Sequence, residues 1–468
     1  MLDLTIRGGL VVTPTVTLPL DVGVLDGKVA VLAARGTLPL ESRETIDATG
    51  TYVIPGGIDA HVHFDLALTE AMRAQTSERG SRAAAYGGTT TFIDFALQQD
   101  DGGLLVAIER RRDELTGQRP HVDYALHAMI TGEAPQEVLD EIPEAIAEGV
   151  NSFKLFTTFS GKSASGTVYT DDGRIWGVME QTARHDGIAM VHCEDNCLID
   201  FCVRRLYREG REQAVNVPLA RPNLVEEAAI GRMLLLSKRS GSPLYIVHVS
   251  THEGIEAITA ARHQGVPVYG EALHLYLCFT KEAYTLPNGA LHHNYPTLKS
   301  ERDRVAIWEA LRAGTLDTVA SDDYTVPRAA KLSGLRVDNL SGGHNGVETR
   351  LGIVYSEGVA KQRLSVNRFV EVTATAPARL FGLYPRKGIL EPGSDADIVL
   401  LDPRAALTLR QADLHSDCDY SVWDGWTCAG YPTTTILRGH VLVRDGVWVG
   451  PEGQGRFVPG RRPEEPRP

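Results

Sequence analysis

The segment GVNSFKLFTTFSGKS (residues 149–163) places Lys154 inside a short apolar run that favours a β-strand. A charged lysine in a packed interior is unfavourable unless its charge is paired or chemically removed. Similar runs recur along the chain, and segments with helical spacing separate them. The eight runs are GGIDAHVHF (56–64), TTTFIDFAL (89–97), VDYALHAMI (122–130), VNSFKLFTT (150–158), GIAMVHCED (187–195), PLYIVHVST (243–251), VPVYGEALH (266–274) and LDTVASDDY (316–324).

Eight short strands that alternate with helices predict a parallel (β/α)8 barrel of the α/β class, which we place at residues 56–385. A doubly wound open sheet is the alternative. It is disfavoured because no GxGxxG or GxxxxGK loop follows any of the runs. Short strands joined by tight turns lie near both chain ends, in residues 1–55 and 386–450. We expect them to form one small β-sandwich domain, with a loose, Pro-, Gly- and charge-rich C-terminal tail at 451–468.

The overall composition bounds the class of partner and the compartment. The 468-residue chain has a net charge of −13, which argues against nucleic acid as a partner because phosphate binding needs a basic face. We find no apolar run of about 20 residues and no charged-then-apolar leader, so we expect neither a membrane span nor a secretory signal. None of the six cysteines lies in a CxxC pair, and this favours a reducing, cytoplasmic setting.

Metal-binding and ionisable side chains stand where the runs end, and catalytic residues of such barrels lie at the carboxyl ends of the strands. His61 and His63 are two residues apart, so on a strand both face the same way. Two imidazoles on one face suit a metal such as zinc better than they suit a core, although a solvated pair is the alternative. Four further runs carry Lys154, His192, His248 and Asp322 near their ends.

Each of the last three residues also has a simpler interpretation. Taken singly, His192 and His248 could be buried histidines bonded to the backbone, and Asp322 could lie in an exposed turn. Their occurrence together, with the pair at the end of the first run, favours metal ligation.

The residue types suggest two metal ions and a role for the lysine. Four imidazoles and one carboxylate suit two divalent ions side by side, but adjacent dications need a bridging anion that histidine does not provide. Carbamylation of Lys154 by CO2 would supply one, because the amine becomes an anionic carbamate with two oxygens. A Schiff-base lysine and a lysine that extends to the rim are the alternatives. Neither explains the presence of four histidines.

Several motifs, in order along the chain, carry a family resemblance. Together they resemble the dihydropyrimidinase/D-hydantoinase family of cyclic amidohydrolases, from the first barrel strand to about residue 450. The motifs are GGIDAHVHFD (56–65), AAAYGGTTTFIDFA (83–96), SFKLF (152–156), VHCED (191–195), IVHVS (246–250), ASDD (320–323), NGVETR (345–350) and FGLYPRKGILEPGSDADIVLLDP (381–403).

The resemblance implies a barrel with a β-sandwich and a binuclear zinc centre. It assigns one metal ion to His61, His63 and Asp322, and the other to His192 and His248. Carbamylated Lys154 and a hydroxide would bridge the two ions. The implied assembly is a homotetramer, with a homodimer as the alternative.

The implied reaction is hydrolysis of a small cyclic amide, namely a hydantoin, a dihydropyrimidine or a related imide, to the N-carbamoyl or amido acid. The bridging hydroxide would attack the carbonyl carbon, and Asp322 would act as general base and then as general acid. A hydrolase of allantoin or dihydroorotate is one alternative. A non-catalytic scaffold homologue is another, and the complete ligand set argues against it.

The substrate-facing region departs from the family pattern. Catalytic members carry a tyrosine five residues after the lysine, and its hydroxyl donates to the developing oxyanion, but this chain has Phe159 there. Tyr295 replaces a substrate-binding serine, and Asp323 replaces the histidine that usually follows the aspartate. Tyr295 and Tyr324 are candidate donors in place of the missing hydroxyl. The expected substrate contacts are Phe159, Tyr295, His344 and Asn345.

Overall fold

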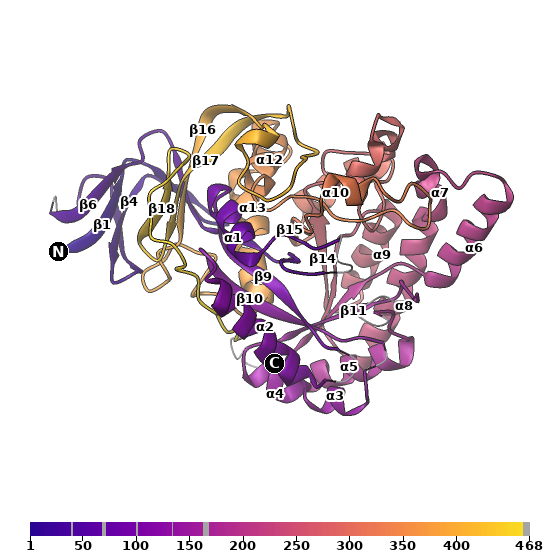
Figure 1. Ribbon diagram of the computed structural model, residues 1–468. Helices are drawn as coiled ribbons and strands as arrows, with labels where there is room; N and C mark the ends of the chain where they lie inside the picture. The colour runs from indigo at the N-terminus through magenta and orange to yellow at the C-terminus, as the bar shows by residue number, and fades with distance from the viewer. Residues whose placement is uncertain (39–40, 68–71, 100–101, 133, 162–167, 462–468) are drawn as a thin grey trace.

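The eight predicted strands form one parallel sheet that curves into a barrel (Figure 1). The computed structural model describes residues 1–38, 41–67, 72–99, 102–132, 134–161 and 168–461. Within the sheet the strands follow each other in chain order, which confirms the (β/α)8 prediction over the open-sheet alternative. They are β8 (Gly57–Asp59), β9 (Thr89–Leu97), β10 (Asp123–Met129), β11 (Ser152–Phe156), β12 (Ile188–His192), β13 (Leu244–Ile246), β14 (Val268–Leu273) and β15 (Thr318–Ala320).

The first and last strands approach each other just beyond their ends. Val62 and Asp323 form an isolated parallel bridge, and the His63 amide donates to the Asp323 carbonyl at 2.8 Å. The Ser321 amide donates to Asp59 Oδ1 at 3.0 Å. These bonds bring the residues that follow β8 beside those that follow β15. The predicted ligands His61 and His63 are thereby placed beside the predicted ligand Asp322.

Helices cover the outside of the barrel, and several begin at capping residues typical of helix starts. Ser300 and Asp303 form a reciprocal capping box at the start of α10, which Gly314 ends in a left-handed conformation. The α-helices are α1 (Ser77–Tyr86), α2 (Leu104–Gln118), α3 (Glu137–Asp140), α4 (Ile142–Ala147), α5 (Asp172–Arg184), α6 (Asn196–Arg208), α7 (Val217–Ala220), α8 (Asn223–Ser240), α9 (His252–His263), α10 (Glu301–Ala313), α11 (Arg328–Lys331), α12 (Arg350–Val354), α13 (Val366–Val370) and α14 (Ala376–Leu380).

Two antiparallel-rich sheets from both chain ends form the β-sandwich. The four-stranded sheet has the order β5-β4-β1-β6, and the seven-stranded sheet has the order β19-β18-β17-β16-β7-β2-β3. Their strands are β1 (Leu2–Arg7), β2 (Leu10–Val12), β3 (Thr17–Leu18), β4 (Leu20–Leu25), β5 (Lys28–Ala34), β6 (Ser42–Asp47), β7 (Tyr52–Pro55), β16 (Ile398–Thr408), β17 (Thr427–Leu437), β18 (His440–Arg444) and β19 (Val447–Trp448).

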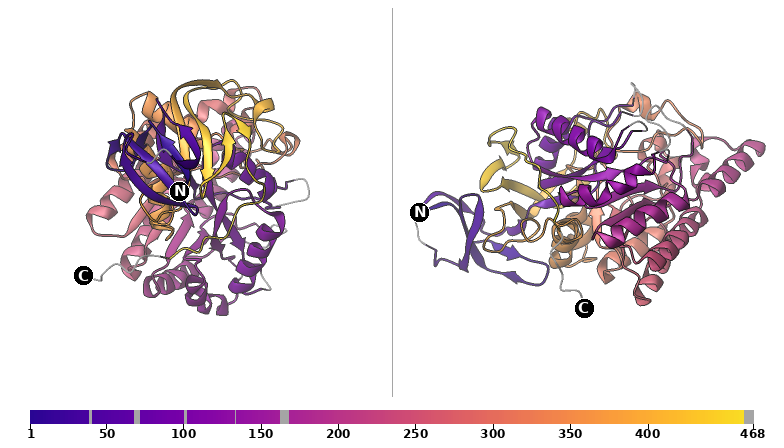
Figure 2. Two further views of the ribbon diagram at one scale, coloured as in Figure 1. Left: turned by 90° about the vertical axis from the view of Figure 1, so that its left-hand side faces the viewer. Right: turned by 90° about the horizontal axis from the view of Figure 1, so that it is seen from below.

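The sandwich core joins the two chain ends. Leu4 and Ile6 alternate along β1 toward the same apolar cluster that receives Ile398 and Leu400 of β16 and Ile436 of β17. Strand β7 pairs antiparallel with β16, so a strand from residues 52–55 lies beside one from near the end of the chain. In two views the C-terminal strands lie between the N-terminal sheet and the barrel (Figure 2).

Part of the expected loose tail is packed against the barrel. Gly455 donates to the Pro120 carbonyl at 2.8 Å, Val458 to the Tyr124 carbonyl at 2.7 Å, and Gly460 to the Gly149 carbonyl at 2.8 Å. The Val458 side chain is fully buried. The prediction of a loose tail is therefore wrong for residues 455–461, because backbone pairing outweighs the composition signal. Residues 462–468 of that tail lie outside the described residues.

A buried lysine joins the barrel to the sandwich. Lys387 Nζ lies 2.6 Å from Asp123 Oδ2 at the start of β10, 2.9 Å from Asp395 Oδ2 and 2.6 Å from Asp397 Oδ2 just before β16. Three buried carboxylates could suggest a metal site. The lysine ammonium group already occupies their centre, so we interpret this cluster as structural.

Among the described residues, no helix is long and apolar enough to cross a membrane.

We predict that Lys387→Met lowers the free energy of unfolding by about 3–5 kcal/mol, because it leaves buried carboxylates without their cation. Urea denaturation followed by circular dichroism measures the change. Lys28→Met is the matched control: Lys28 lies 2.6 Å from Asp395, but its side chain is 46% exposed. Such an exposed pair contributes at most about 1 kcal/mol. Equal losses in the two variants would contradict the structural role of Lys387.

Candidate metal centre

The structure brings the six predicted ligands to one end of the barrel. Lys154 lies within β11, and His192 is the last residue of β12. The other four follow β8, β13 and β15 directly: His61 and His63, His248, and Asp322. All six are buried except His63, which is partly exposed. This is the end at which the catalytic residues of (β/α)8 enzymes lie.

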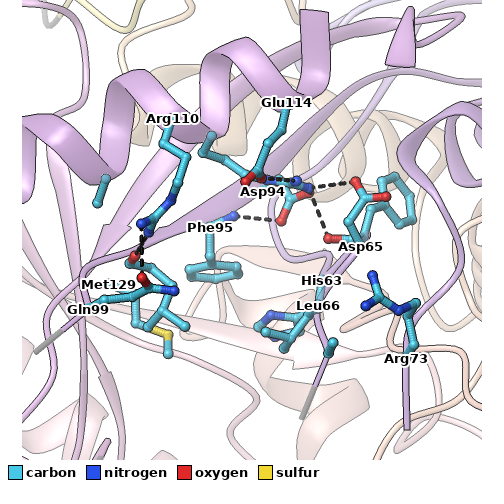
Figure 3. Close-up of a pocket in the computed structure, with 15 residues that line it drawn as sticks. His63, Asp65, Leu66, Arg73, Asp94, Phe95, Gln99, Arg110, Glu114 and Met129 are labelled. Atoms are coloured by element: carbon cyan, nitrogen blue, oxygen red, sulfur yellow. Dashed lines mark hydrogen bonds and ion pairs between the residues drawn. The ribbon is translucent and has the colours of Figure 1, made fainter. Parts of the chain in front are cut away.

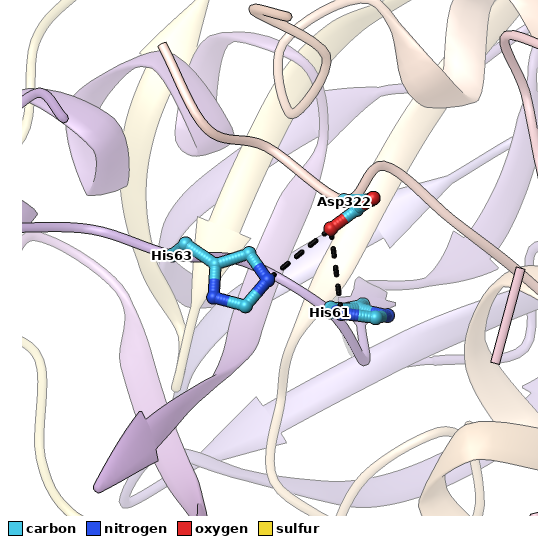
Figure 4. A group of neighbouring side chains, drawn as sticks. All are labelled: His61, His63 and Asp322. Carbon is cyan, nitrogen blue, oxygen red and sulfur yellow. Dashed lines mark ion pairs between the residues drawn. The ribbon is translucent and has the colours of Figure 1, made fainter. Parts of the chain in front are cut away.

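His61, His63 and Asp322 converge on one point (Figure 4). Asp322 Oδ1 lies 3.3 Å from His61 Nε2 and 3.2 Å from His63 Nε2. Asp322 Oδ2 accepts a hydrogen bond of 2.8 Å from Asn294 Nδ2, which fixes the plane of the carboxylate. Two imidazole nitrogens and a carboxylate oxygen at this separation form a donor set that fits a divalent cation such as zinc.

Electrostatics favour the ligand forms of these side chains. Burial, followed by the charge of Lys154, lowers the pKa of His61 well below its usual value, so its imidazole is neutral. Burial would raise the pKa of Asp322, but His61 and His63 hold it well below its usual range. A neutral imidazole and an ionised carboxylate are the states that bind metal ions.

Lys154 points into this group. Its Nζ lies 3.3 Å from His61 Nε2, and the rings of Phe95 and Phe156 lie 5.3 and 4.9 Å from it. The lysine is 1% exposed, so it does not extend to the solvent at the rim, and that alternative is wrong. Burial lowers the pKa of Lys154 to about 8, which increases the uncharged fraction of the amine.

His192 and His248 stand beside the first three residues. Their ring centroids are 4.4 Å apart, and the His248 ring lies 5.6 Å from that of His61. His248 Nδ1 is buried and has no hydrogen-bond partner in the described part of the chain. Burial lowers the pKa of both imidazoles. Two buried neutral imidazoles, of which His248 has a nitrogen unpaired in the described part of the chain, suit further metal ligands.

Three residues of the site have unusual backbone conformations. Phe159, His248 and Asp322 have φ values of 65°, 41° and 52°, in the left-handed region that favours glycine. Such strain persists only where the surroundings hold it, and it is common at functional sites. His248 and Asp322 immediately follow barrel strands, so this turn of the chain helps to aim their side chains into the barrel mouth.

Two buried carboxylates behind the histidines were missed by the sequence analysis. Glu271 Oε1 lies 2.8 Å from His61 Nδ1 and accepts a 3.0 Å hydrogen bond from the His248 amide. Burial raises the pKa of Glu271 to about 8, and a nearby cation would favour its ionised form. In its ionised form Glu271 accepts a hydrogen bond from the Nδ1–H of His61, which leaves the Nε2 lone pair facing Asp322 and Lys154. The signal was an acidic residue inside the apolar run VPVYGEALH.

Glu194 orients His192, which belongs to the second pair of histidines, as Glu271 orients His61. Its Oε2 lies 2.9 Å from His192 Nε2 and 2.5 Å from Arg221 Nη1. Burial would raise the pKa of Glu194, but Arg221 and His192 lower it to about 2, so it is a carboxylate. Nε2 of His192 therefore donates to Glu194, which leaves Nδ1 as the ligand atom. The motif VHCED contained this residue, but no local pattern indicated its partner Arg221.

Phe159 and Tyr295 lie beside the second pair of histidines. The Phe159 ring is 5.2 Å from those of His192 and Tyr295, and Arg221 lies over both aromatic rings, at 5.3 and 4.3 Å. The Tyr295 hydroxyl donates to the Leu340 carbonyl at 2.8 Å. It is thus engaged in a loop contact, which weakens its candidacy as the donor that Phe159 lacks.

The remaining residues predicted near the substrate lie in the loop after β15. The Tyr324 hydroxyl donates to the Met72 carbonyl at 2.8 Å. His344 and Asn345 are buried, and both His344 ring nitrogens lack a partner among the described residues. Asp323 was expected to face the substrate, and this is wrong. Its carboxylate accepts the amides of Gly346 and Val347 at 2.7 and 3.0 Å, so it orders this loop.

One further group of metal-capable side chains lies outside the barrel mouth, at the starts of α9 and α10. His252 contacts Asp303 at 2.7 Å and Glu253 at 3.1 Å. Asp303 also belongs to the capping box of α10, and Asn223 donates to Glu253 and Asp303. These contacts satisfy the group internally, so we interpret it as a junction between helices.

Comparison with known proteins agrees with this geometry. The sequence profile of the amidohydrolase family matches residues 52–442. The chain is 35% identical over 461 residues to a D-hydantoinase of Streptomyces coelicolor, which covers 97% of each protein. It is also 35% identical over 458 residues to a D-hydantoinase of Geobacillus stearothermophilus, covering 97% of this chain and 95% of the relative.

Solved structures give the same result. A crystal structure of a D-hydantoinase superimposes with a TM-score of 0.93 at 33% identity and covers 99% of both chains. An L-hydantoinase (dihydropyrimidinase) from Arthrobacter aurescens gives 0.91 at 32% identity, covering 98% of this chain and 100% of that one. The chain therefore belongs to the amidohydrolase family, in its hydantoinase and dihydropyrimidinase group, and is a cyclic amidohydrolase that acts on C–N bonds of cyclic amides.

Proposed function

We propose that the enzyme uses two zinc ions and a carbamylated Lys154 to open the ring of a hydantoin or a dihydropyrimidine. The observation that carries this proposal is the convergence of four imidazoles, one carboxylate and a buried amine at the mouth of the barrel. His61, His63 and Asp322 would hold one ion, and His192 and His248 the other. When bound, two such ions lower the pKa of a water molecule between them and polarise the substrate carbonyl.

Lys154 would supply the anionic group between the ions. The uncharged amine attacks CO2, a C–N bond forms, and one proton leaves, so that the product is a carbamate with two oxygens. The lowered pKa and burial of Lys154 support this step, because a desolvated amine loses its proton more readily. The modification also removes a positive charge that would otherwise repel the cations.

Asp322 would carry the proton through the reaction. Its carboxylate accepts a proton from the attacking water and passes it to the ring nitrogen as the amide C–N bond breaks. Asn294 holds Asp322 Oδ2 at 2.8 Å and so keeps the carboxylate in one orientation during both transfers. For a hydantoin or dihydropyrimidine ring, the product is an N-carbamoyl amino acid.

The names of the relatives support a hydantoin as substrate, and an allantoin or dihydroorotate ring is the second candidate. The zinc-loaded enzyme should hydrolyse hydantoin or dihydrouracil faster than allantoin or dihydroorotate, with the ring-opened product identified by mass spectrometry. Faster turnover of allantoin or dihydroorotate would favour the second candidate. We further propose that the enzyme is a homotetramer, which light scattering of the purified enzyme tests. Its proposed location is the cytoplasm.

We predict that zinc uptake by the metal-free protein depends on bicarbonate. In CO2-free buffer Lys154 remains an amine, so the protein should retain little zinc after desalting. Added bicarbonate should restore about two ions per chain. Lys154→Met should retain little zinc under both conditions, whereas the exposed Lys238→Met should behave as the unchanged protein. Full zinc binding by Lys154→Met, or full uptake without CO2, would contradict the carbamate.

We predict that Glu194→Gln weakens zinc binding by roughly 10–100-fold, because the amide no longer fixes the proton of His192 as the carboxylate does. Competition with a chromophoric chelator measures the affinity. Glu227→Gln, in the exposed part of the neighbouring helix α8, is the control and should leave the affinity unchanged. An unchanged zinc affinity in Glu194→Gln would show that the hydrogen bond between Glu194 and His192 does not affect a metal ligand.

We predict that Phe159→Tyr increases kcat on the best cyclic amide of the panel by about tenfold or more, because one oxyanion donor is worth about 10²–10³ in rate. The hydroxyls of Tyr295 and Tyr324 are bonded to backbone carbonyls, so neither replaces it in this conformation. Phe156→Tyr, at the last residue of β11 and three positions before Phe159, serves as the comparison. A lower or equal kcat in Phe159→Tyr would mean that another donor already acts on the substrate.

A further inference from the structure

A cavity of about 390 Å³ adjoins the metal centre, and His63 belongs to both (Figure 3). A volume of this size accommodates part or all of a small ligand. The ring of Phe95 stacks on His63 with centroids 4.6 Å apart, and Lys154 Nζ lies 5.3 Å from the same ring. A substrate whose carbonyl lies at the metal centre could therefore extend a ring substituent past His63 into this space.

Most charges on the cavity wall compensate one another around Arg111. This residue is 6% exposed and lies 2.6 Å from Asp94, 3.1 Å from Asp65 and 3.1 Å from Glu114. The second oxygen of Asp65 accepts a hydrogen bond of 2.6 Å from Gln118. The carboxylates of the wall are thus directed to Arg111, which is surrounded by more negative charge than it carries.

Two other arginines of the wall have no carboxylate partner in the described ranges. Arg110 donates to the neutral oxygens of Leu97 at 2.7 Å and Gln99 at 3.1 Å. Arg73 forms no side-chain hydrogen bond or ion pair with any described residue, and it lies on the His63 side of the cavity (Figure 3). Among the described residues, none occupies the five N–H donors of the Arg73 guanidinium group.

Part of the cavity wall is apolar. Phe95, Leu97 and Met129 line it, and Phe95 and Met129 are largely buried. A chain of methylene groups can pack there, whereas a bare ion without an apolar stem would leave this surface uncovered. The wall therefore combines apolar side chains with an arginine that has no ion-pair partner among the described residues.

We propose that this cavity binds a negatively charged substituent of the cyclic amide, a carboxylate on a short alkyl stem, and that Arg73 selects for it. The proposal rests on the proposed function and names its substrate class. A guanidinium group binds a carboxylate through two parallel hydrogen bonds. An uncharged substituent would displace water from Arg73 without offering it a charged partner, and the enzyme should therefore discriminate against it.

The test compares two hydantoins that differ only at the end of one side chain, a carboxyethyl hydantoin and its carbamoylethyl counterpart. The zinc-loaded enzyme should favour the carboxylate by roughly tenfold in kcat/KM, the size expected for a charge-assisted hydrogen bond. In Arg73→Gln this ratio should fall toward one. High salt should reduce the ratio in the unchanged enzyme, but not in Arg73→Gln, because exposed charges are screened.

Arg79→Gln is the matched control, since Arg79 is exposed, close in sequence and not part of the cavity wall. It should keep the full preference. A ratio near one in the unchanged enzyme, or a ratio that survives in Arg73→Gln, would overturn the anionic subsite while leaving the hydrolase function in place. Failure to hydrolyse either hydantoin or unsubstituted hydantoin and dihydrouracil would instead count against the proposed function.

Discussion

The chemistry of the site depends on how the positive charge of one buried amine, that of Lys154, is neutralised or removed. Lys154 is almost fully buried 3.3 Å from an imidazole, in surroundings that lower the pKa of every nearby histidine for which a shift is resolved. As an ammonium group it would repel any metal ion bound by His61. As a carbamate the same side chain carries a negative charge and two oxygens at the same place. The barrel makes this possible, because β11 positions Lys154 and the contact between the ends of β8 and β15 brings two histidines and Asp322 to it.

Two buried carboxylates behind the histidines determine which imidazole nitrogen faces the centre. Glu271 accepts the Nδ1 proton of His61, and Glu194 accepts the Nε2 proton of His192, so different nitrogens of the two rings are left to bind metal. Each carboxylate is itself held in place, Glu271 by the His248 amide and Tyr245, and Glu194 by Arg221. The fold therefore determines which nitrogen of each of these two rings faces the centre.

The sequence predicted the barrel and the residues at its mouth because both depend on local signals. An apolar run shows a strand, and a histidine or aspartate at its end shows a candidate ligand. Contacts between distant runs have no such signal, which is why Glu271 and Arg221 were missed. Asp323 was misassigned for the same reason: its neighbour Asp322 faces the centre, and only the turn at Asp322 reveals that the next side chain points to the Gly346 amide. The packing of residues 455–461 rests on backbone hydrogen bonds that composition does not report.

The predicted ligands and Arg73 of the cavity wall lie on different parts of this fold. The predicted ligands sit on strands or directly at strand ends, where neighbouring strands restrict them from both sides. Arg73 and Leu66 of the cavity wall come from the segment between β8 and α1, and Gln99 comes from the one between β9 and α2, so substitutions there leave the sheet unchanged. Phe159 likewise lies outside the barrel strands, just after β11. A chain can therefore keep the ligand geometry of a hydantoinase while its side-chain subsite acquires a different charge preference, since Arg73 lies in the segment between β8 and α1 and not in the barrel sheet.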